Sequence, residues 1–244
     1  MAGHVLDSGV RLSQARVWDL EKEFYVGGGA DVWKDELVPS LATASSAGAL
    51  DFCRAFAAFV EDRTGCFVGP CVSDYTGSGF VILEMGSGVG KFAFLFLLHL
   101  QELAEQAECP RLLDPTFVQY VMTDVSRDNI EALSRQPQLR AFREKGILRL
   151  AHLDAESSTG YHDDLGLGNH HVFCVTNYVM GVMRQDLFRV RDGKLEEGLV
   201  TTRSVGGGPS NQTEAEEVKA LALSLSSLRL SYSFNRCCPD NYFE

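Results

Sequence analysis

The sequence has no C-x-x-C pair, although it contains seven cysteines among its 244 residues. Zinc sites usually draw on closely spaced cysteine pairs, and a disulfide framework is typical of a short chain with an even number of cysteines. We therefore predict neither a metal site nor a disulfide framework. Mostly buried thiols in a reducing compartment are expected instead.

Long apolar runs and clusters of basic residues are missing as well. The longest apolar run, Phe92 to Leu98, is far shorter than the roughly 20 residues that span a bilayer. The formal net charge of −11 and the lack of a Lys/Arg cluster argue against general nucleic-acid binding. The first residues have neither a secretory hydrophobic region nor an Arg- and Ser-rich leader. No membrane association is predicted, and a cytoplasmic location is expected, with a mitochondrial one as the alternative.

The most informative feature is a glycine-rich turn, E-M-G-S-G-V-G from Glu84 to Gly90, which joins a buried strand to a long apolar helix. A dinucleotide fingerprint would need glycine at 91, where the chain has lysine. A phosphate loop would need glycine at 85 and a hydroxyl residue at 92, where it has methionine and phenylalanine. The carboxylate before the glycines suits a cationic cofactor without phosphate. A turn that only lets helix and strand pack closely is the alternative.

Three predicted strands end on a carboxylate. In chain order the four strands are Phe80 to Glu84, Phe117 to Thr123 with Asp124 after it, Ile147 to Leu153 with Asp154 after it, and His171 to Thr176. Their alternation with helices and loops predicts an α/β fold with a doubly wound, mostly parallel sheet. Since the carboxyl ends of parallel strands share one edge of the sheet, the three carboxylates are expected there together.

The remaining segments set the expected domain organisation. Residues 1–79 are predicted to form a helical region, and residues 80–244 a Rossmann-like domain. Within that domain, Leu187 to Thr201 is predicted to be an inserted β-hairpin that turns at Asp192-Gly193, because this pair accepts positive φ angles. Leu228 to Phe234 alternates apolar and polar residues as a strand would. A seven-stranded sheet needs more strands than these, so we expect a chain that is incomplete at its C-terminus.

The chain resembles the MidA-like branch of the class I S-adenosylmethionine-dependent methyltransferases. The resemblance covers about Phe24 to Phe243 and rests on four segments, LEMGSGVGKFAF, YVMTDVS, LAHLDAE and VTNYVMGVMRQDLFRVRDGKL. Its most specific part is the glycine turn, which is similar to motif I of that family. The resemblance implies a Rossmann-like fold and S-adenosyl-L-methionine as the cofactor. The chain departs from the family at Thr176, where a small residue is expected, and at Gly181-Val182-Met183, where an acidic and proline turn is expected.

The resemblance assigns the methionine end of the cofactor to the glycine turn. Glu84 would attract the methionyl ammonium and orient the turn. Gly86, Gly88 and Gly90 would let the backbone approach the cofactor without a clash from Cβ atoms, and Ser87, between them, is expected to contact the cofactor as well.

The nucleoside end is assigned to the next two strands. Asp124, with Val125 beside it, would accept hydrogen bonds from the two ribose hydroxyls, which a carboxylate can do. Asp154, with Ala155 beside it, would accept one from the adenine amine. For each aspartate taken alone, a helix cap or a solvated loop residue is the alternative.

Asn177 and Tyr178 end the fourth strand, where class I enzymes meet the methyl acceptor; Asn177 is also expected to contact the cofactor. Methyl transfer from a sulfonium is an in-line displacement, so the enzyme chiefly positions the nucleophile and removes its proton. Asn177 would orient an acceptor nitrogen and Tyr178 would wall the pocket, or Asn177 would simply cap the strand end.

The implied activity is methyl transfer to a protein side chain or a small molecule, and the sequence does not name the acceptor. A non-catalytic assembly or interaction protein that keeps the same fold is the second class, favoured by the altered turn at residues 181–184 and by the early end of the chain. Homodimerisation stays open.

Overall fold

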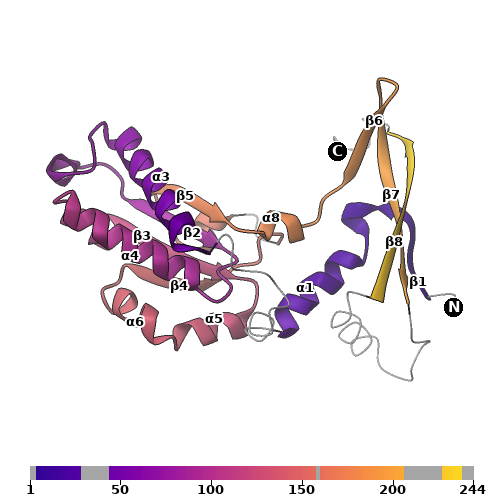
Figure 1. The fold of residues 1–244 in the computed structure, drawn as a ribbon, viewed down its shortest axis with the longest axis horizontal. Helices are drawn as coiled ribbons and strands as arrows, with labels where there is room; N and C mark the ends of the chain where they lie inside the picture. Colours follow the sequence, from indigo (N-terminus) through magenta and orange to yellow (C-terminus); the bar gives the residue numbers. More distant parts are fainter. Residues whose placement is uncertain (1–3, 29–43, 158–159, 206–226, 238–244) are drawn as a thin grey trace. The chain divides into compact units, whose positions relative to one another are not determined.

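The fold is that of a computed structural model, which describes residues 4–28, 44–157, 160–205 and 227–237. The chain divides into two compact units, one of residues 29–180 and the other of residues 1–28 together with 181–244 (Figure 1). This division differs from the predicted boundary between residues 79 and 80. The physical reason is that the first residues pair with a strand that lies beyond residue 181.

The unit of residues 29–180 contains a four-stranded sheet. Its strands are β2 (Phe80–Met85), β3 (Val118–Asp124), β4 (Leu148–His152) and β5 (His171–Thr176). All neighbouring pairs are parallel, and the spatial order is β4-β3-β2-β5. The predicted doubly wound parallel sheet is thus confirmed. From β2 the chain adds β3 and β4 on one side and then returns to add β5 on the other. The carboxyl edge between β2 and β5 is therefore a topological switch point, where open α/β sheets bind ligands.

The helices of this part of the chain begin and end at recognisable signals. The helices are α3 (Ser46–Thr64), α4 (Lys91–Gln106), α5 (Arg127–Ser134), α6 (Pro137–Glu144), α7 (Tyr161–Asp164) and α8 (Val179–Val182), with 3-10 turns η2 (Pro70–Asp74) and η3 (Pro110–Leu113). Ser45 caps α3 by accepting a hydrogen bond from Gly48 N, and Gly65 ends it at φ 71°. Ser126 caps α5 by accepting a hydrogen bond from Asn129 N.

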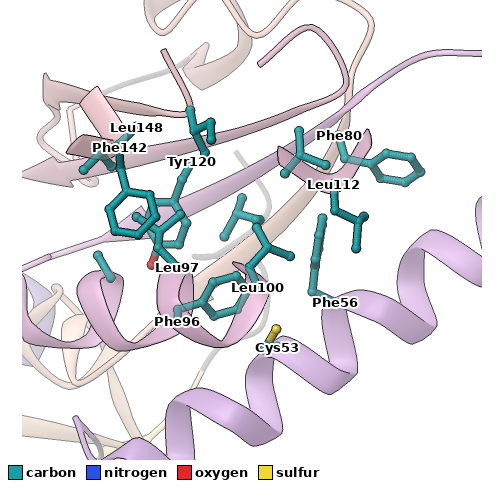
Figure 2. Close-up of a cluster of buried hydrophobic side chains, with 14 of the residues drawn as sticks. Cys53, Phe56, Phe80, Phe96, Leu97, Leu100, Leu112, Tyr120, Phe142 and Leu148 are labelled. Carbon is teal, nitrogen blue, oxygen red and sulfur yellow. The ribbon is translucent and has the colours of Figure 1, made fainter. Parts of the chain in front are cut away.

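Both faces of the parallel sheet are covered, and the alternation of β2 shows how. Phe80 and Ile82 point into a large cluster with α3 and α4, whereas Val81 and Leu83 point into a second cluster on the opposite face. Figure 2 shows Phe80 in the first cluster with other fully buried aromatic rings, which include Phe56, Phe96 and Tyr120. Burial on both faces explains why β2 is a continuous apolar run and not an alternating one.

The other unit is built on antiparallel strands. They are β1 (His4–Arg11), β6 (Leu187–Arg191), β7 (Lys194–Ser204) and β8 (Leu228–Arg236), accompanied by the turn η1 (Leu12–Gln14) and the helix α1 (Val17–Gly28). The long strand β7 pairs with β8 along most of its length, so β1 and β6 share its other edge. A small core of Ala15, Trp18 and Val200 joins α1 to this sheet.

The hairpin predicted between Leu187 and Thr201 is confirmed as β6 and β7. Asp192 and Gly193 form its turn, at φ 51° and 73° respectively. The hairpin belongs to the antiparallel unit, however, and not to the parallel sheet. The region expected to be helical also opens with a strand, β1, whose partner lies some 190 residues further along the chain. Among the described residues, no helix is both long and apolar enough to span a bilayer.

Candidate functional site

The turn after β2 has a backbone conformation that favours glycine at the three predicted positions. Gly86, Gly88 and Gly90 have φ angles of 69°, 51° and 73°, a region that side chains rarely tolerate. A Cβ atom on Gly86 would lie 2.5 Å from Val179 Cγ2, and one on Gly90 would lie 2.8 Å from Leu133 Cδ2. Gly90 therefore serves the packing of α4 on its neighbours, whereas Gly86 is exposed at the edge of the sheet.

A phosphate would need backbone N–H groups of this turn, but most of them already donate hydrogen bonds within the protein. Ser87 N donates to Thr123 O at 2.9 Å, and Gly90 N donates to Ser87 O at 2.8 Å. Gly88 N donates to the Asp124 carboxylate at 3.2 Å. Phosphate loops bind their ligand through unengaged N–H groups of this kind. The turn is thus poorly suited to a phosphate, in agreement with the glycine spacing.

Asp124, at the end of β3, is held by three donors and is only 8% exposed. Its Oδ1 atom accepts from Ser126 N at 2.9 Å, and its Oδ2 atom accepts from Gly88 N and from Asn129 Nδ2, the latter at 2.9 Å. Burial raises the pKa of this carboxyl, and the three donors oppose that rise. A carboxylate has about four acceptor positions, so one remains. Binding both ribose hydroxyls would require one of the present donors to give way.

Glu84 lies in the interior, with 3% of its surface exposed. Ser87 Oγ donates to its Oε2 atom at 3.0 Å, and Thr123 Oγ1 donates to its backbone carbonyl at 2.8 Å. Burial raises the pKa of the Glu84 carboxyl to about 8; the Ser87 and Tyr120 hydroxyls oppose the rise, and Asp124 adds to it. Glu84 therefore holds a proton at neutral pH, and its predicted attraction for an ammonium group needs that proton to leave.

The loop after β4 lies beside the end of β3. Leu153 N donates to Asp124 O at 3.0 Å, which brings Asp154 to the same edge of the sheet as the other predicted residues. Asp154 is half-buried, and its Oδ1 atom accepts from Glu156 N at 3.2 Å. The Ala155 carbonyl accepts a hydrogen bond from the Tyr161 hydroxyl.

Val125 follows Asp124, and its carbonyl group contacts His152 Nε2 at 3.1 Å. Its side chain is half-buried. The end of β3 is thus tied to β4 through the backbone of a predicted cofactor residue.

Asn177 and Tyr178 follow β5 directly beside the glycine turn. Met85 pairs with Thr176, so Gly86 and Asn177 are the next residues of two neighbouring strands. Asn177 is half-buried, and Tyr178 is 56% exposed with φ 64°. A tyrosine in this left-handed region is strained, and such strain is concentrated at functional sites.

Sequence reasoning missed Asn129 and Thr123. Asn129 is 2% exposed, and its amide donates to Gly88 O at 2.8 Å as well as to Asp124. Its signal in the sequence is slight, an amide three residues after the capping Ser126 in a helix that starts at the predicted sheet edge. Helical side chains point toward the N-terminus of their helix, and this directs Asn129 back to the turn.

Neither the known family models nor the curated proteins include a match to this chain. Two solved structures from Burkholderia thailandensis are similar to it. One is a COG1565 superfamily member, thought to be a methyl transferase and bound to S-adenosyl-homocysteine, with 20% identity and a TM-score of 0.39 over 87% of this chain and 48% of that one. The other, an uncharacterized ACR of the same superfamily, has 15% identity and a TM-score of 0.41 over 94% of this chain and 50% of that one.

The present chain thus spans about half the length of these structures. The strand order β4-β3-β2-β5 and the three positive-φ glycines between β2 and α4 give the fold independently of them. By these features, the unit of residues 29–180 has a Rossmann-like fold.

Proposed function

We propose that this protein is an S-adenosylmethionine-dependent methyltransferase that acts on a protein side chain or a small molecule. The observation that carries the proposal is the Asp124 carboxylate, which holds Gly88 N at the end of β3, next to the switch point between β2 and β5. A carboxylate at that place, one βα unit after a glycine turn, is suited to the ribose of a nucleoside cofactor.

The acidic groups and the engaged N–H groups at the sheet edge favour this cofactor over a phosphate-bearing one. Glu84, Asp124 and Asp154 are acidic, and the N–H groups of Ser87 and Gly88 donate to protein acceptors. S-adenosyl-L-methionine carries an ammonium group, a sulfonium and two ribose hydroxyls but no phosphate. When bound, it supplies an electrophilic methyl group.

In the proposed complex, different groups of the protein bind different parts of the ligand. The exposed Gly86 lets the methionine part approach the backbone, and Glu84 attracts its ammonium. Asp124 accepts from the ribose, and Asp154 accepts from the adenine amine.

The acceptor would enter beside Asn177 and Tyr178. The Asn177 side chain would orient the nucleophilic atom of the acceptor, and the exposed Tyr178 ring would form a wall of the pocket. Because methyl transfer needs alignment more than proton chemistry, these positioning roles suffice for a rate enhancement.

Labelled S-adenosyl-L-methionine offered with a panel of protein and small-molecule acceptors tests the activity. We expect label in at least one acceptor, and we expect an Asn177→Ala variant to lose transfer even when the cofactor concentration is high enough to saturate it. Cofactor binding without transfer to any acceptor would favour the second class, a non-catalytic assembly or interaction protein. The residues that favour this second class are Gly181, Val182 and Met183, which replace the acidic and proline turn expected from the resemblance.

A further inference from the structure

We infer that Asn129 is a positioning residue, which locks Asp124 onto the glycine turn and thereby sets the affinity of the site for its nucleoside ligand. This inference rests on the proposed function. Its basis is a single amide nitrogen, Asn129 Nδ2, that donates to Gly88 O at 2.8 Å and to Asp124 Oδ2 at 2.9 Å.

The three groups form a closed ring of hydrogen bonds. Gly88 N donates to Asp124 Oδ2 at 3.2 Å, and the Asn129 amide bridges that same oxygen and the Gly88 carbonyl. Gly88 is therefore held at both its N–H and its C=O. The ring joins the turn after β2 to the end of β3 and to the first turn of α5.

Asn129 is itself held in place. Its backbone N–H donates to Ser126 Oγ at 3.3 Å, and Ser126 N donates to Asp124 Oδ1 at 2.9 Å. Asn129 and Ser126 are 2% and 1% exposed, so water does not compete freely for these bonds. A buried donor network of this kind fixes the orientation of a carboxylate before a ligand arrives.

The chemistry of the ring requires an amide at position 129. Both of its partners, a carbonyl and a carboxylate, only accept hydrogen bonds, so the bridging group must donate twice. Aspartate has nearly the same size as asparagine but donates only when protonated. An Asn129→Asp substitution thus changes the donor while largely keeping the shape.

The Asn129→Asp variant gives a readout that a purely structural role would not move. Two carboxyl groups at this distance share a proton at low pH, and their second ionisation is shifted to higher pH. With the proton the new side chain can donate once, to Asp124, and so keeps one of the two bonds of the bridge; without it the two charges repel. We expect the affinity of the variant for S-adenosyl-homocysteine, relative to that of the wild type, to fall at least about tenfold between pH 5.5 and pH 8.5.

The other titratable groups that face Asp124 are Glu84 from β2 and His152 from β4. Glu84 and His152 are present in both proteins, so the affinity of the Asn129→Asp variant should be compared with that of the wild type at the same pH. Asn129→Ala should weaken binding about tenfold at every pH. Asp128→Asn, on the exposed side of the same helical turn, is the matched control and should stay within about twofold of the wild type.

Isothermal titration calorimetry with S-adenosyl-homocysteine, with thermal unfolding as a check of folding, separates the outcomes. The inference is overturned if both Asn129 variants bind as tightly as the wild type and the ratio of wild-type to Asn129→Asp affinity does not grow with pH. That result leaves the proposed function standing. A folded wild type that does not bind overturns the proposed function and the inference with it. If Asn129→Ala does not fold, Asn129→Asp decides alone, since it can still donate to Asp124 at low pH.

Discussion

The Ser87 hydroxyl donates a hydrogen bond to Glu84 Oε2 across 3.0 Å, and both side chains are buried. The carboxylate that precedes the glycine turn is therefore an internal group of the site. Burial, with a contribution from Asp124, raises its pKa to about 8, against the opposing effect of the Ser87 and Tyr120 hydroxyls. Its protonation state links the stability of the fold to the binding of a cationic ligand.

Binding of S-adenosyl-homocysteine at pH 7 should release a proton from Glu84. The unliganded carboxyl is protonated below about pH 8, and an ammonium group prefers the ionised form. Affinity should rise as pH increases toward 8, and less so in Glu84→Gln. Calorimetry in two buffers of different ionisation enthalpy measures the released proton; equal heats in both would count against this coupling.

The same carboxyl should make the fold less stable as pH rises. The pKa of Glu84 is raised on folding from its ordinary value of 4.5 to about 8. The stability that this group contributes is fully present below about pH 4.5 and is lost as pH rises through about 8. Urea unfolding at pH 5 and pH 8 should show a smaller loss of unfolding free energy in Glu84→Gln than in the wild type. An identical pH dependence would show that Glu84 is not the group responsible.

Asp124→Ala should cost about 1.5–3 kcal/mol of cofactor affinity, the scale of hydrogen bonds to a charged group. The variant also loses the acceptor for Ser126, Gly88 and Asn129, so its thermal stability must be measured alongside calorimetry. Unchanged affinity in a folded variant would refute the assignment of Asp124 to the ribose.

The hairpin turn between β6 and β7 makes a prediction independent of the cofactor. Gly193 has φ 73°, so Gly193→Val should destabilise the antiparallel unit by about 1–2 kcal/mol. Asp192→Gly is the matched control, because Asp192 also has a positive φ, of 51°, and glycine accepts that angle without strain. Urea unfolding measures both; a Gly193→Val variant as stable as the wild type would contradict the proposed strain.

The parallel sheet could be predicted because its signals are local. The run from Phe80 to Leu83 is apolar and buried on both faces, and the glycines shortly after it have positive φ angles, which favour glycine. Both the strand and the turn can therefore be predicted from neighbouring residues. Asp124 could be predicted for the same reason, because it is the last residue of β3. The hairpin at Asp192-Gly193 is local in the same sense.

What escaped prediction depends on contacts between distant residues. Strand β1 gains its partner β7 only after the chain has passed through the whole parallel sheet, and its own residues do not alternate regularly between buried and exposed. The division into two units follows from that pairing. Asn129 was missed for a similar reason, since its importance comes from Gly88, 41 residues away in sequence.

In the proposed function, the glycine turn and Asp124 bind S-adenosyl-L-methionine. Isothermal titration calorimetry of the folded protein with S-adenosyl-L-methionine and S-adenosyl-homocysteine tests it most directly, with Gly88→Val as the variant. We expect both ligands to bind, and to bind the variant more weakly, because Gly88 has φ 51° and a β-branched residue resists that angle. No measurable heat and no thermal shift with either ligand, on folded protein, would contradict it.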